Sequence, residues 1–315
     1  MIRIGVVGAG KIGAAHKTAI QNNPDCTLVA ACDLDIEKAK AMAEGTDARV
    51  YTDYRVMRES EELDAVILNL PHFLHAPVSV YFLDQRIPVL VEKPMANTVA
   101  ECDAMIEAAE RNATPLAVGH VQRYFPAYRA LREIIASGKL GKLCQITETR
   151  NINYFPNRPA WFLDKKKAGG GIIMNFGAHT MDKVLYATGL EVESVAAAGN
   201  NFLTDDTVEA TAQMLVRFKG GVSGVFSYSG THGPSYYQTD FYFTDGVARV
   251  ARGGEELWVA EGTARLEKVE LEPSDLFRDQ LAEFVKLLRG EATEVVLPDY
   301  GRRVIRVIES AVSQF

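Results

Sequence analysis

The first 33 residues constrain the fold more than any other part of the chain. An apolar run at 2–7 leads into the glycine turn GAGKIG, a helical stretch through Ala19, a second apolar run at 28–32 and then Asp33. A strand that enters a helix through a glycine turn and is followed by another apolar strand is a βαβ unit with parallel strands. The sequence therefore predicts a parallel sheet in the N-terminal part.

The same rhythm continues to about residue 120. Short apolar runs alternate with helix-like stretches, and each run is apolar throughout, as is typical of strands buried on both faces. We therefore expect an α/β first domain over residues 1–121, a doubly wound parallel sheet with helices on both faces. Its strands are expected at 2–7, 28–32, 65–70, 89–91 and 116–118.

After Gly119 the pattern changes, which predicts a second domain over residues 122–315. Residues 208–218 alternate between apolar and polar side chains, as in an antiparallel strand with one covered face. Further extended runs are separated by glycines and polar turns, so we expect an antiparallel sheet. These runs are 143–153, 222–229, 238–243, 247–251 and 256–260, and helices are expected at 124–136, 171–187, 277–288 and 304–312.

Composition limits the possible partners. A formal charge of −7 argues against a surface that tracks nucleic-acid phosphates. The N-terminus lacks the features of a secretory signal, and no apolar stretch reaches the roughly 18 residues of a membrane span. We expect a cytoplasmic protein without nucleic-acid or membrane partners. The spacing of Cys26, Cys32, Cys102 and Cys144 predicts reduced, mostly buried cysteines and no metal site.

The glycine turn predicts a dinucleotide site. The glycines permit a tight turn and close approach of the backbone to a pyrophosphate, which the N-terminus of the following helix attracts. Asp33 ends the next strand, where an acid accepts hydrogen bonds from the adenosine ribose hydroxyls. Its carboxylate repels a 2′-phosphate and no basic residue follows before Lys38, so we expect NAD rather than NADP. The expected contacts of the turn are Gly8, Gly10, Lys11, Ile12 and Gly13.

Two further stretches carry side chains suited to chemistry. Glu92, Lys93 and Pro94 follow an apolar run, at the strand ends where open parallel sheets bind ligands. Lys93 can stabilise a developing oxyanion, and the alternative is a surface lysine paired with Glu92. The stretch GGGIIMNFGAHTMD places Asn175 and His179 on one helical face. Histidine exchanges protons near neutral pH, and the alternative is a core histidine.

In this order and spacing, the glycine turn, the Glu-Lys-Pro step and the glycine-histidine helix resemble the Gfo/Idh/MocA family, over essentially the whole chain. The resemblance implies an N-terminal Rossmann domain and a C-terminal α+β domain with a large, open, mainly antiparallel sheet. Domain 122–315 would then bind substrate and form a homodimer or homotetramer through that sheet. It also implies NAD(P)-dependent oxidation or reduction at a ring carbon of a sugar or cyclitol.

The resemblance also suggests roles for single residues. Lys93 is similar to the family's catalytic lysine and His179 to its proton-transfer histidine. Asn175 stands where the family usually has an aspartate, and an amide can bind a hydroxyl but cannot stabilise an imidazolium as a carboxylate would. The segment after the fourth strand and the Glu-Lys-Pro step are expected near the cofactor, namely Asn69, Pro71, His75, Glu92 and Lys93.

Substrate contacts are expected from loops of the second domain, because loops carry the residues that vary with function. For Arg123 a structural role between domains is the alternative. Lysines 165–167 are typical of a solvated surface, and recognition of a sugar phosphate is the alternative. His72 and His75 have no third ligand that would suggest a metal. The candidate substrate residues are Arg123, Tyr124, Arg158, Trp161, Asp182 and Tyr236.

The leading hypothesis is an NAD-dependent oxidoreductase that moves a hydride between nicotinamide and a CH–OH or C=O carbon of a sugar, sugar derivative or cyclitol. Lys93, His179 and Asn175 would be the catalytic residues. A non-catalytic NAD-binding regulator and an NAD-dependent glycosidase, both found in the resembled family, are the alternatives.

Overall fold

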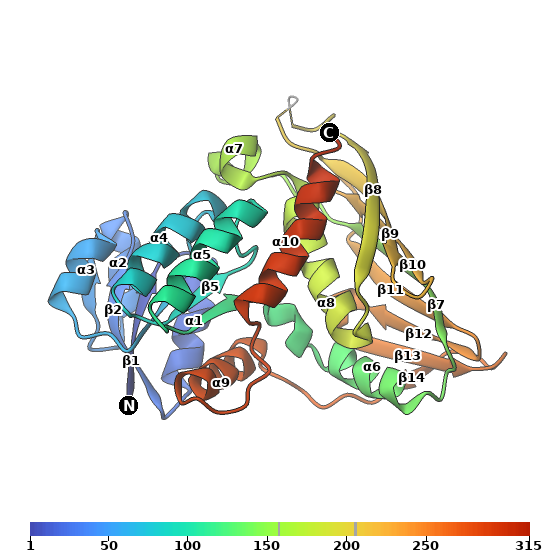
Figure 1. Cartoon of the computed structure of the whole chain (residues 1–315), viewed down its shortest axis with the longest axis horizontal. Helices are drawn as coiled ribbons and strands as arrows, with labels where there is room; N and C mark the ends of the chain where they lie inside the picture. The colour runs from blue at the N-terminus through green and yellow to red at the C-terminus, as the bar shows by residue number, and fades with distance from the viewer. Residues whose placement is uncertain (157, 205–206) are drawn as a thin grey trace. The chain divides into compact units, whose positions relative to one another are not determined.

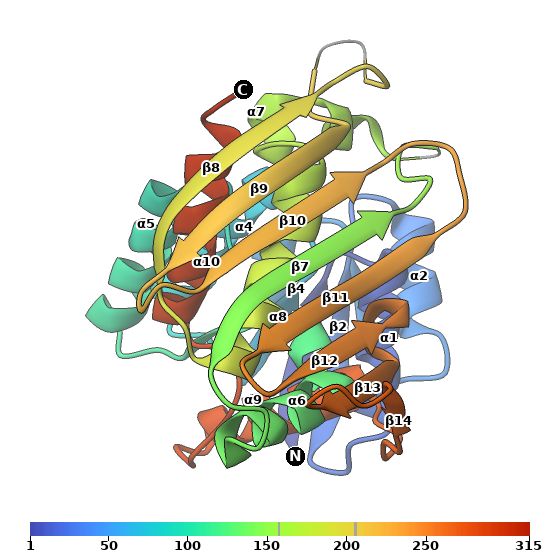
Figure 2. The same cartoon turned by 90° about the vertical axis from the view of Figure 1, so that its right-hand side faces the viewer.

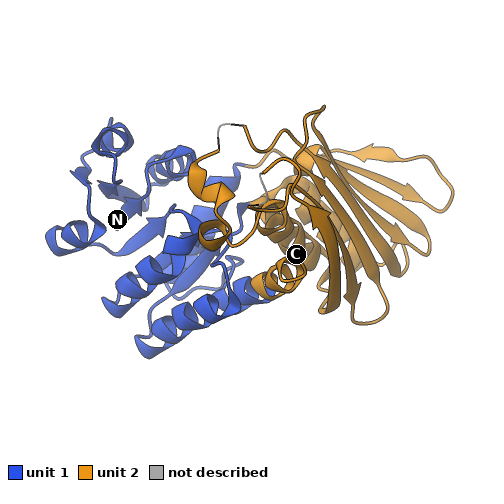
Figure 3. Cartoon of the chain, turned by 90° about the horizontal axis from the view of Figure 1, so that it is seen from above, with its two compact units in different colours: residues 1–121, 275–303 blue, residues 122–274, 304–315 orange. Residues whose placement is uncertain are grey.

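The structure, a computed structural model, describes residues 1–156, 158–204 and 207–315. It divides the chain into two compact units, shown in different colours in Figure 3. Unit 1 comprises residues 1–121 and 275–303, and unit 2 comprises residues 122–274 and 304–315. We expected 122–315 to form one domain, but residues 275–303 pack with unit 1 instead.

Unit 1 contains a parallel sheet of six strands in the order β3-β2-β1-β4-β5-β6. The apolar rhythm predicted all of these strands except β3, which has only three residues. The order reverses between β1 and β4, which is the position where doubly wound sheets bind ligands. The strands are β1 (Ile2–Val7), β2 (Cys26–Cys32), β3 (Arg49–Tyr51), β4 (Ala65–Leu68), β5 (Val89–Glu92) and β6 (Leu116–Gly119).

Helices cover both faces of this sheet. On one face Ile4, Ile67 and Leu90 belong to a core cluster with residues of α1, α2 and α9. The alternate residues Val66 and Val89 are also fully buried, and α4 contacts β4 and β5 and packs beside α5 (Figure 1). The helices are α1 (Lys11–Gln21), α2 (Ile36–Ala43), α3 (Tyr54–Ser60), α4 (His72–Asp84), α5 (Val99–Arg111) and α9 (Leu276–Leu288).

The helix α9 explains why residues 275–303 belong to unit 1. Its side chains Leu281, Phe284 and Val285 are buried in the same cluster as Ile20 of α1. The apolar spacing predicted this helix, but spacing cannot tell which sheet an amphipathic helix covers. Sequence position alone suggested the nearer domain.

Unit 2 contains the expected large sheet, with eight strands in the order β14-β13-β12-β11-β7-β10-β9-β8. Only β7 and β10 pair in parallel, and the other neighbours are antiparallel. The alternation predicted for 208–218 is confirmed in β9, where every second side chain is buried. The strands are β7 (Leu143–Asn151), β8 (Val192–Asn200), β9 (Thr211–Phe218), β10 (Ser223–Ser229), β11 (Tyr236–Phe243), β12 (Gly246–Ala251), β13 (Glu256–Glu261) and β14 (Glu267–Val269).

The helices of unit 2 lie against one face of this sheet, which we call the inner face. Helix α6 (Pro126–Ser137) contacts β12 and β13 and packs against α8 (Ala178–Thr188). Buried rings such as Phe226 and Phe241 fill this face. The opposite face, called the outer face, is turned towards the viewer in Figure 2, and the labelled helices of unit 2, α6, α7 and α8, lie behind the sheet in that view. The last helix, α10, spans Pro298–Val312.

Candidate functional site

The glycine turn of unit 1 has two glycines that the packing requires. Gly8 has φ +96, and a Cβ there would lie 2.3 Å from the carbonyl oxygen of Asn69 at the end of β4. A Cβ on Gly13 would lie 2.4 Å from the carbonyl oxygen of Gly8. Neither position accepts a side chain, so the turn and the start of α1 are fixed against the end of β4. Asn69 therefore lies at the glycine turn, and its contact with the cofactor stays a prediction.

Gly10 is different, because no atom lies within 4 Å of the position that its Cβ would occupy. It caps the exposed N-terminus of α1 without a side-chain hydrogen bond, and no acidic residue lies in the first turn. The first N–H groups of a helix point outwards and carry its positive dipole end. With the exposed Lys11 and Ile12, this arrangement suits a pyrophosphate.

Asp33 stands at the end of β2 with both carboxylate oxygens engaged. Oδ2 accepts a hydrogen bond of 2.8 Å from the backbone N–H of Ala9, and Oδ1 accepts one of 2.9 Å from that of Asp35. These bonds hold a negative charge beside the glycine turn. Asp35 itself caps α2 through the N–H of Glu37, and its carboxylate lies 3.6 Å from Lys38.

Polar contacts fix the backbone of the Glu92-Lys93-Pro94 segment on both sides of Lys93. Glu92 is buried, with Oε1 lying 3.0 Å from Nε2 of His16 and Oε2 accepting the Lys93 N–H at 3.1 Å. The carbonyl oxygen of Pro94 lies 2.8 Å from Nδ1 of His75. Glu92 and His75 therefore position the lysine backbone.

His75 has no room for a direct role in this structure. It is fully buried, and its Nε2 lies 2.8 Å from the carbonyl oxygen of Leu70, just before Pro71. Burial lowers the pKa of His75, although its two backbone contacts oppose the change. The ring links the segment after β4 to the segment after β5, and His72, also buried, lies next to it.

In unit 2 a third glycine contact fixes the other predicted helix. A Cβ on Gly171 would lie 2.1 Å from the carbonyl oxygen of Glu209, and that oxygen accepts the N–H of Ile172. The Glu209 carboxylate is buried, which raises its pKa, and it accepts the N–H of Ile173 at 3.0 Å. The segment then makes one π-helical turn, Ile173–Gly177, before α8. Such π turns occur often at functional sites.

Asn175 lies in that π turn and His179 in the first turn of α8. The Asn175 amide donates from Nδ2 to the hydroxyl of Tyr154, a buried residue of the loop after β7. Burial raises the pKa of Tyr154, while Asn175 opposes the change. His179 is 9% exposed. The structure thus brings Asn175 and His179 onto one helical segment, as the spacing predicted.

Three of the candidate substrate residues lie in the interior of unit 2. Asp182 is fully buried and accepts hydrogen bonds from Nε and Nη2 of Arg123 at 3.1 and 2.5 Å. Arg123 also lies over the ring of Tyr186. Tyr124 is 2% exposed. The ion pair joins the segment before α6 to α8, which favours the structural role considered for Arg123.

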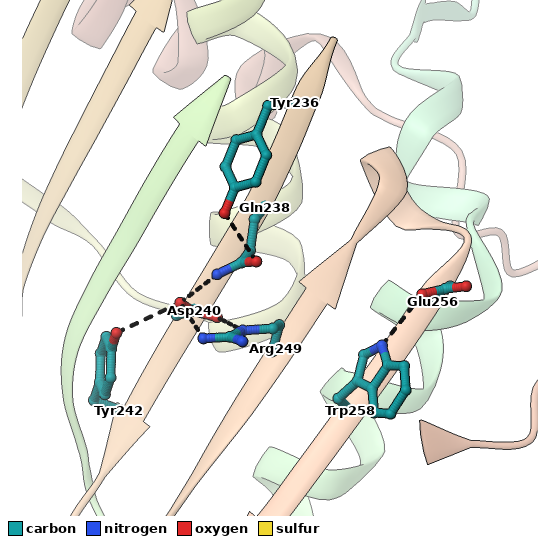
Figure 4. Close-up of polar contacts among 7 residues, drawn as sticks. All are labelled: Tyr236, Gln238, Asp240, Tyr242, Arg249, Glu256 and Trp258. Carbon is teal, nitrogen blue, oxygen red and sulfur yellow. Dashed lines mark hydrogen bonds and ion pairs between the residues drawn. The ribbon is translucent and has the colours of Figure 1, made fainter. Parts of the chain in front are cut away.

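Tyr236 lies on the outer face of the sheet, away from α8. It is 48% exposed, and its hydroxyl donates a hydrogen bond to Gln238. Gln238 donates in turn to Asp240, which also accepts a hydrogen bond from Arg249 (Figure 4). The neighbouring residue Tyr237 takes the inner position instead. The structure therefore does not bring Tyr236 together with Asn175 and His179.

The loop after β7 holds Arg158 and Trp161 among aromatic rings. Arg158 donates from Nε to the Tyr154 carbonyl at 2.8 Å, and Trp161 stacks on Phe162 at 3.8 Å. The exposed lysine run 165–167 forms most of the four-residue helix α7 (Lys165–Ala168), whose last residue, Ala168, is buried. Lys165 donates to the carbonyl of Phe315, and Lys167 pairs with Asp164 at 3.4 Å.

Sequence reasoning missed several polar residues of these regions. His16 belongs to a helix whose sequence gives no sign of its bond to Glu92. Charged residues inside a strand or helix normally indicate a solvent-exposed face, yet several lie on the inner side of unit 2. The missed residues are His16, Glu148, Arg150, Tyr154, Lys183 and Tyr237.

Comparison with known proteins agrees with this geometry. Residues 2–120 match the model of an oxidoreductase family with an NAD-binding Rossmann fold, and residues 128–249 match the GFO/IDH/MocA C-terminal domain. The protein is thus an NAD-binding oxidoreductase. The chain belongs to the Gfo/Idh/MocA family, and the expected family, fold class and enzyme class are confirmed.

Individual relatives cover most of the chain. It is 29% identical to the myo-inositol 2-dehydrogenase of Thermotoga maritima, over 72% of this chain and 68% of that protein. It is 26% identical to the rhizopine catabolism protein MocA of Rhizobium meliloti, over 98% and 93%. An oxidoreductase domain protein from Kribbella flavida has a similar structure, with a TM-score of 0.87, 26% identity and coverage of 100% and 98%.

None of the helices in the described part of the chain combines the length and apolar composition of a membrane span. Within 1–156, 158–204 and 207–315, no three or more His, Cys, Asp or Glu side chains are grouped so that they could hold a metal ion. Three of the cysteines are buried, and Cys144 is exposed.

The glycine geometry predicts different outcomes at two positions. In Gly10→Ala the fold has room for the methyl group, so stability should be unchanged, while NAD binding should weaken about tenfold or more because the backbone can no longer approach the pyrophosphate. In Gly13→Ala stability itself should fall, because the methyl group meets Gly8. Thermal unfolding and NAD calorimetry measure both effects. Wild-type NAD affinity in Gly10→Ala would contradict the assignment.

Proposed function

We propose that the protein transfers a hydride between NAD and a CH–OH or C=O carbon of a sugar, sugar derivative or cyclitol. Membership of an NAD-binding oxidoreductase family supports the reaction type, and the name of the Thermotoga maritima relative supports a cyclitol or sugar substrate. The observation that carries the proposal is the fixed backbone of Lys93, which lies at the ligand-binding edge of the unit 1 sheet.

Lys93 acts as the electrophilic group. Its N–H is held by Glu92, and the next carbonyl, that of Pro94, contacts His75. Both contacts fix the backbone at Lys93, which positions the start of its side chain. An ammonium placed at a developing alkoxide stabilises the negative charge that forms as the hydride leaves.

His179 accepts the proton of the substrate hydroxyl in the oxidative direction and returns it in the reductive one. Asn175 orients that hydroxyl by donating an amide N–H to its oxygen, because the single hydroxyl proton goes to His179 and the amide nitrogen carries a second N–H besides the one donated to Tyr154. The aspartate usual in the family would also stabilise the imidazolium form of the histidine, and an amide does not. NAD, when bound at the turn from Gly8 to Gly13, supplies the hydride acceptor.

The cofactor is NAD rather than NADP. The carboxylate of Asp33 is fixed by two backbone N–H groups beside the glycine turn. A 2′-phosphate on the adenosine ribose would meet this charge, while the nearby Lys38 is already paired with Asp35. The alternatives, a non-catalytic regulator and an NAD-dependent glycosidase, have no observation in their favour.

The protein assembles as a homodimer or homotetramer through the outer face of the unit 2 sheet. Leu215 and Val225 are directly paired on this face and are 49% and 40% exposed. Tyr236 adds a third exposed apolar side chain. Large apolar side chains gathered on one exposed sheet face favour association with another protein surface.

Lys93→Met should lower kcat by about 10²–10³-fold with the best substrate of a sugar and cyclitol panel, because the oxyanion loses its donor. The affinity for NAD should stay close to that of the wild type. NADH absorbance gives the rate, calorimetry gives the affinity, and Lys40→Met serves as a control at an exposed lysine. Near-normal turnover of Lys93→Met would remove the proposed role.

The KM for NADP should exceed that for NAD about tenfold or more, because Asp33 repels the 2′-phosphate. Asp33→Asn removes the charge and should narrow this difference. Initial rates with each cofactor at saturating substrate measure both effects. Equal or reversed preference in the wild-type enzyme would overturn the choice of NAD.

Leu215→Arg should convert the oligomer to a smaller species, because it places a charge on the proposed contact face. Light scattering after size-exclusion chromatography gives the molar mass. Val56→Arg, at a position of unit 1 with the same 49% exposure, should leave the mass unchanged. A wild-type protein that is monomeric at micromolar concentration would contradict the assembly.

A further inference from the structure

Two arginines of unit 2 rest on aromatic rings beside Asn175. The guanidinium carbon of Arg150, on β7, lies 3.6 Å from the ring centroid of Phe176 and 4.5 Å from that of Tyr237. That of Arg158, in the loop after β7, lies 4.1 Å from the centroid of Tyr154. The rings of Tyr154 and Phe176 meet edge to face at 5.0 Å. One aromatic cluster thus carries two guanidinium groups, which attract the ring faces.

Both guanidinium groups keep hydrogen-bonding capacity that the protein does not use. Arg158 donates from Nε to the Tyr154 carbonyl, and no other hydrogen bond of its guanidinium is formed within the described residues. In Arg150, Nε and Nη1 are buried and have no partner in that same part of the chain. Buried charged donors without acceptors are costly, so such groups commonly mark a place for a ligand or ion.

The carboxylates of this region are engaged elsewhere. Glu148 accepts hydrogen bonds from Thr180 and Thr239, and Glu209 accepts the N–H of Ile173. Asp182 is paired with Arg123. No acidic side chain therefore neutralises the two arginines directly among the residues that the structure describes.

Lys183 adds a further positive charge to the same interior. It is fully buried, its Nζ has no hydrogen-bond acceptor in the described chain, and it lies 4.3 Å from the ring centroid of Tyr237. Burial lowers its pKa to about 8, so the side chain remains mostly protonated at neutral pH. Arg150, Arg158 and Lys183 together outnumber the carboxylates of Glu148 and Glu209, since Asp182 is paired with Arg123.

The surplus charge lies next to the proposed catalytic segment. The Tyr154 hydroxyl accepts the amide N–H of Asn175, and both Arg150 and Arg158 act electrostatically on that hydroxyl. A group bound by these arginines would thus lie close to the hydroxyl that Asn175 orients. The lysines 165–167, the other candidates for an anion, are exposed, and two of them have partners of their own.

We propose that Arg150 and Arg158 bind an anionic substituent, a carboxylate or phosphate, of the sugar or cyclitol substrate. This inference rests on the proposed function and narrows its substrate class. A guanidinium offers planar paired donors that match either group, and Arg158 has its two Nη groups available for such bonding. Arg150 adds a second guanidinium from the same aromatic cluster.

Binding to the NADH complex tests the proposal without turnover of the alcohols used. Calorimetry compares methyl β-D-glucuronide with methyl β-D-glucoside, and myo-inositol 1-phosphate with myo-inositol, so the two pairs distinguish a carboxylate from a phosphate. In at least one pair the anionic member should bind about tenfold or more tightly than the neutral one. The absence of such a preference in both pairs overturns the proposal.

Variants assign the preference to the arginines. Arg158→Gln should reduce the preference for the anionic ligand about tenfold or more. Arg158→Lys should give a preference between those of the wild type and Arg158→Gln, because lysine keeps the charge but lacks the paired donors. Arg265→Gln, on an exposed loop, removes the same charge and should change nothing. Arg150→Gln should also reduce the preference, provided that circular dichroism shows it folded. An undiminished preference in Arg158→Gln overturns the proposal.

The same preparations separate this inference from the proposed function. Each is mixed with NAD and the sugar panel, and NADH absorbance is followed. An arginine-dependent anion preference without NADH formation from any sugar would reject the proposed function and leave the anion site standing. NADH formation from a sugar without any anion preference would support the proposed function and reject the anion site.

Discussion

A Cβ atom at Gly8 would lie 2.3 Å from the carbonyl oxygen of Asn69, and one at Gly171 would lie 2.1 Å from that of Glu209. These two steric contacts fix the starts of the helical segments to which we assign cofactor binding and proton transfer. In unit 1 the contact sets the N-terminus of α1 and brings Ala9 to Asp33. In unit 2 it sets the π turn that carries Asn175 and leads to His179.

The buried charged groups of the two units differ in how fully their hydrogen-bonding atoms have partners. In unit 1 the buried carboxylate of Glu92 is satisfied by His16 and by the backbone of Lys93, so its charge serves to hold a neighbouring residue. In unit 2 the buried carboxylate of Glu148 likewise accepts hydrogen bonds from two threonines, but Arg150 and Lys183 retain donors without acceptors among the described residues. Complete satisfaction favours rigidity, whereas unused donors favour recognition of another molecule.

The sequence carried enough information to predict the two sheets, the glycine turn and the helical segment that carries Asn175 and His179. Strands buried on both faces are continuously apolar, and the glycine spacing has a steric cause that the structure reproduces at Gly8 and Gly13. Strand β8 was missed because its apolar residues are small and most of its side chains are exposed. The face that Tyr236 takes could not be predicted either, since one residue of register decides which face of the sheet a side chain occupies.

Residues 275–303 belong to unit 1, although the main part of unit 2 separates them in sequence from the rest of that unit. Phe284 and Leu281 fill the core that α1 and β1 also build, although more than 150 residues of unit 2 intervene. A fragment ending at residue 121 would therefore expose apolar surface that the whole protein covers. Neither unit is one uninterrupted stretch of chain, so recombination that exchanges the cofactor-binding part must transfer two separate pieces of the gene together.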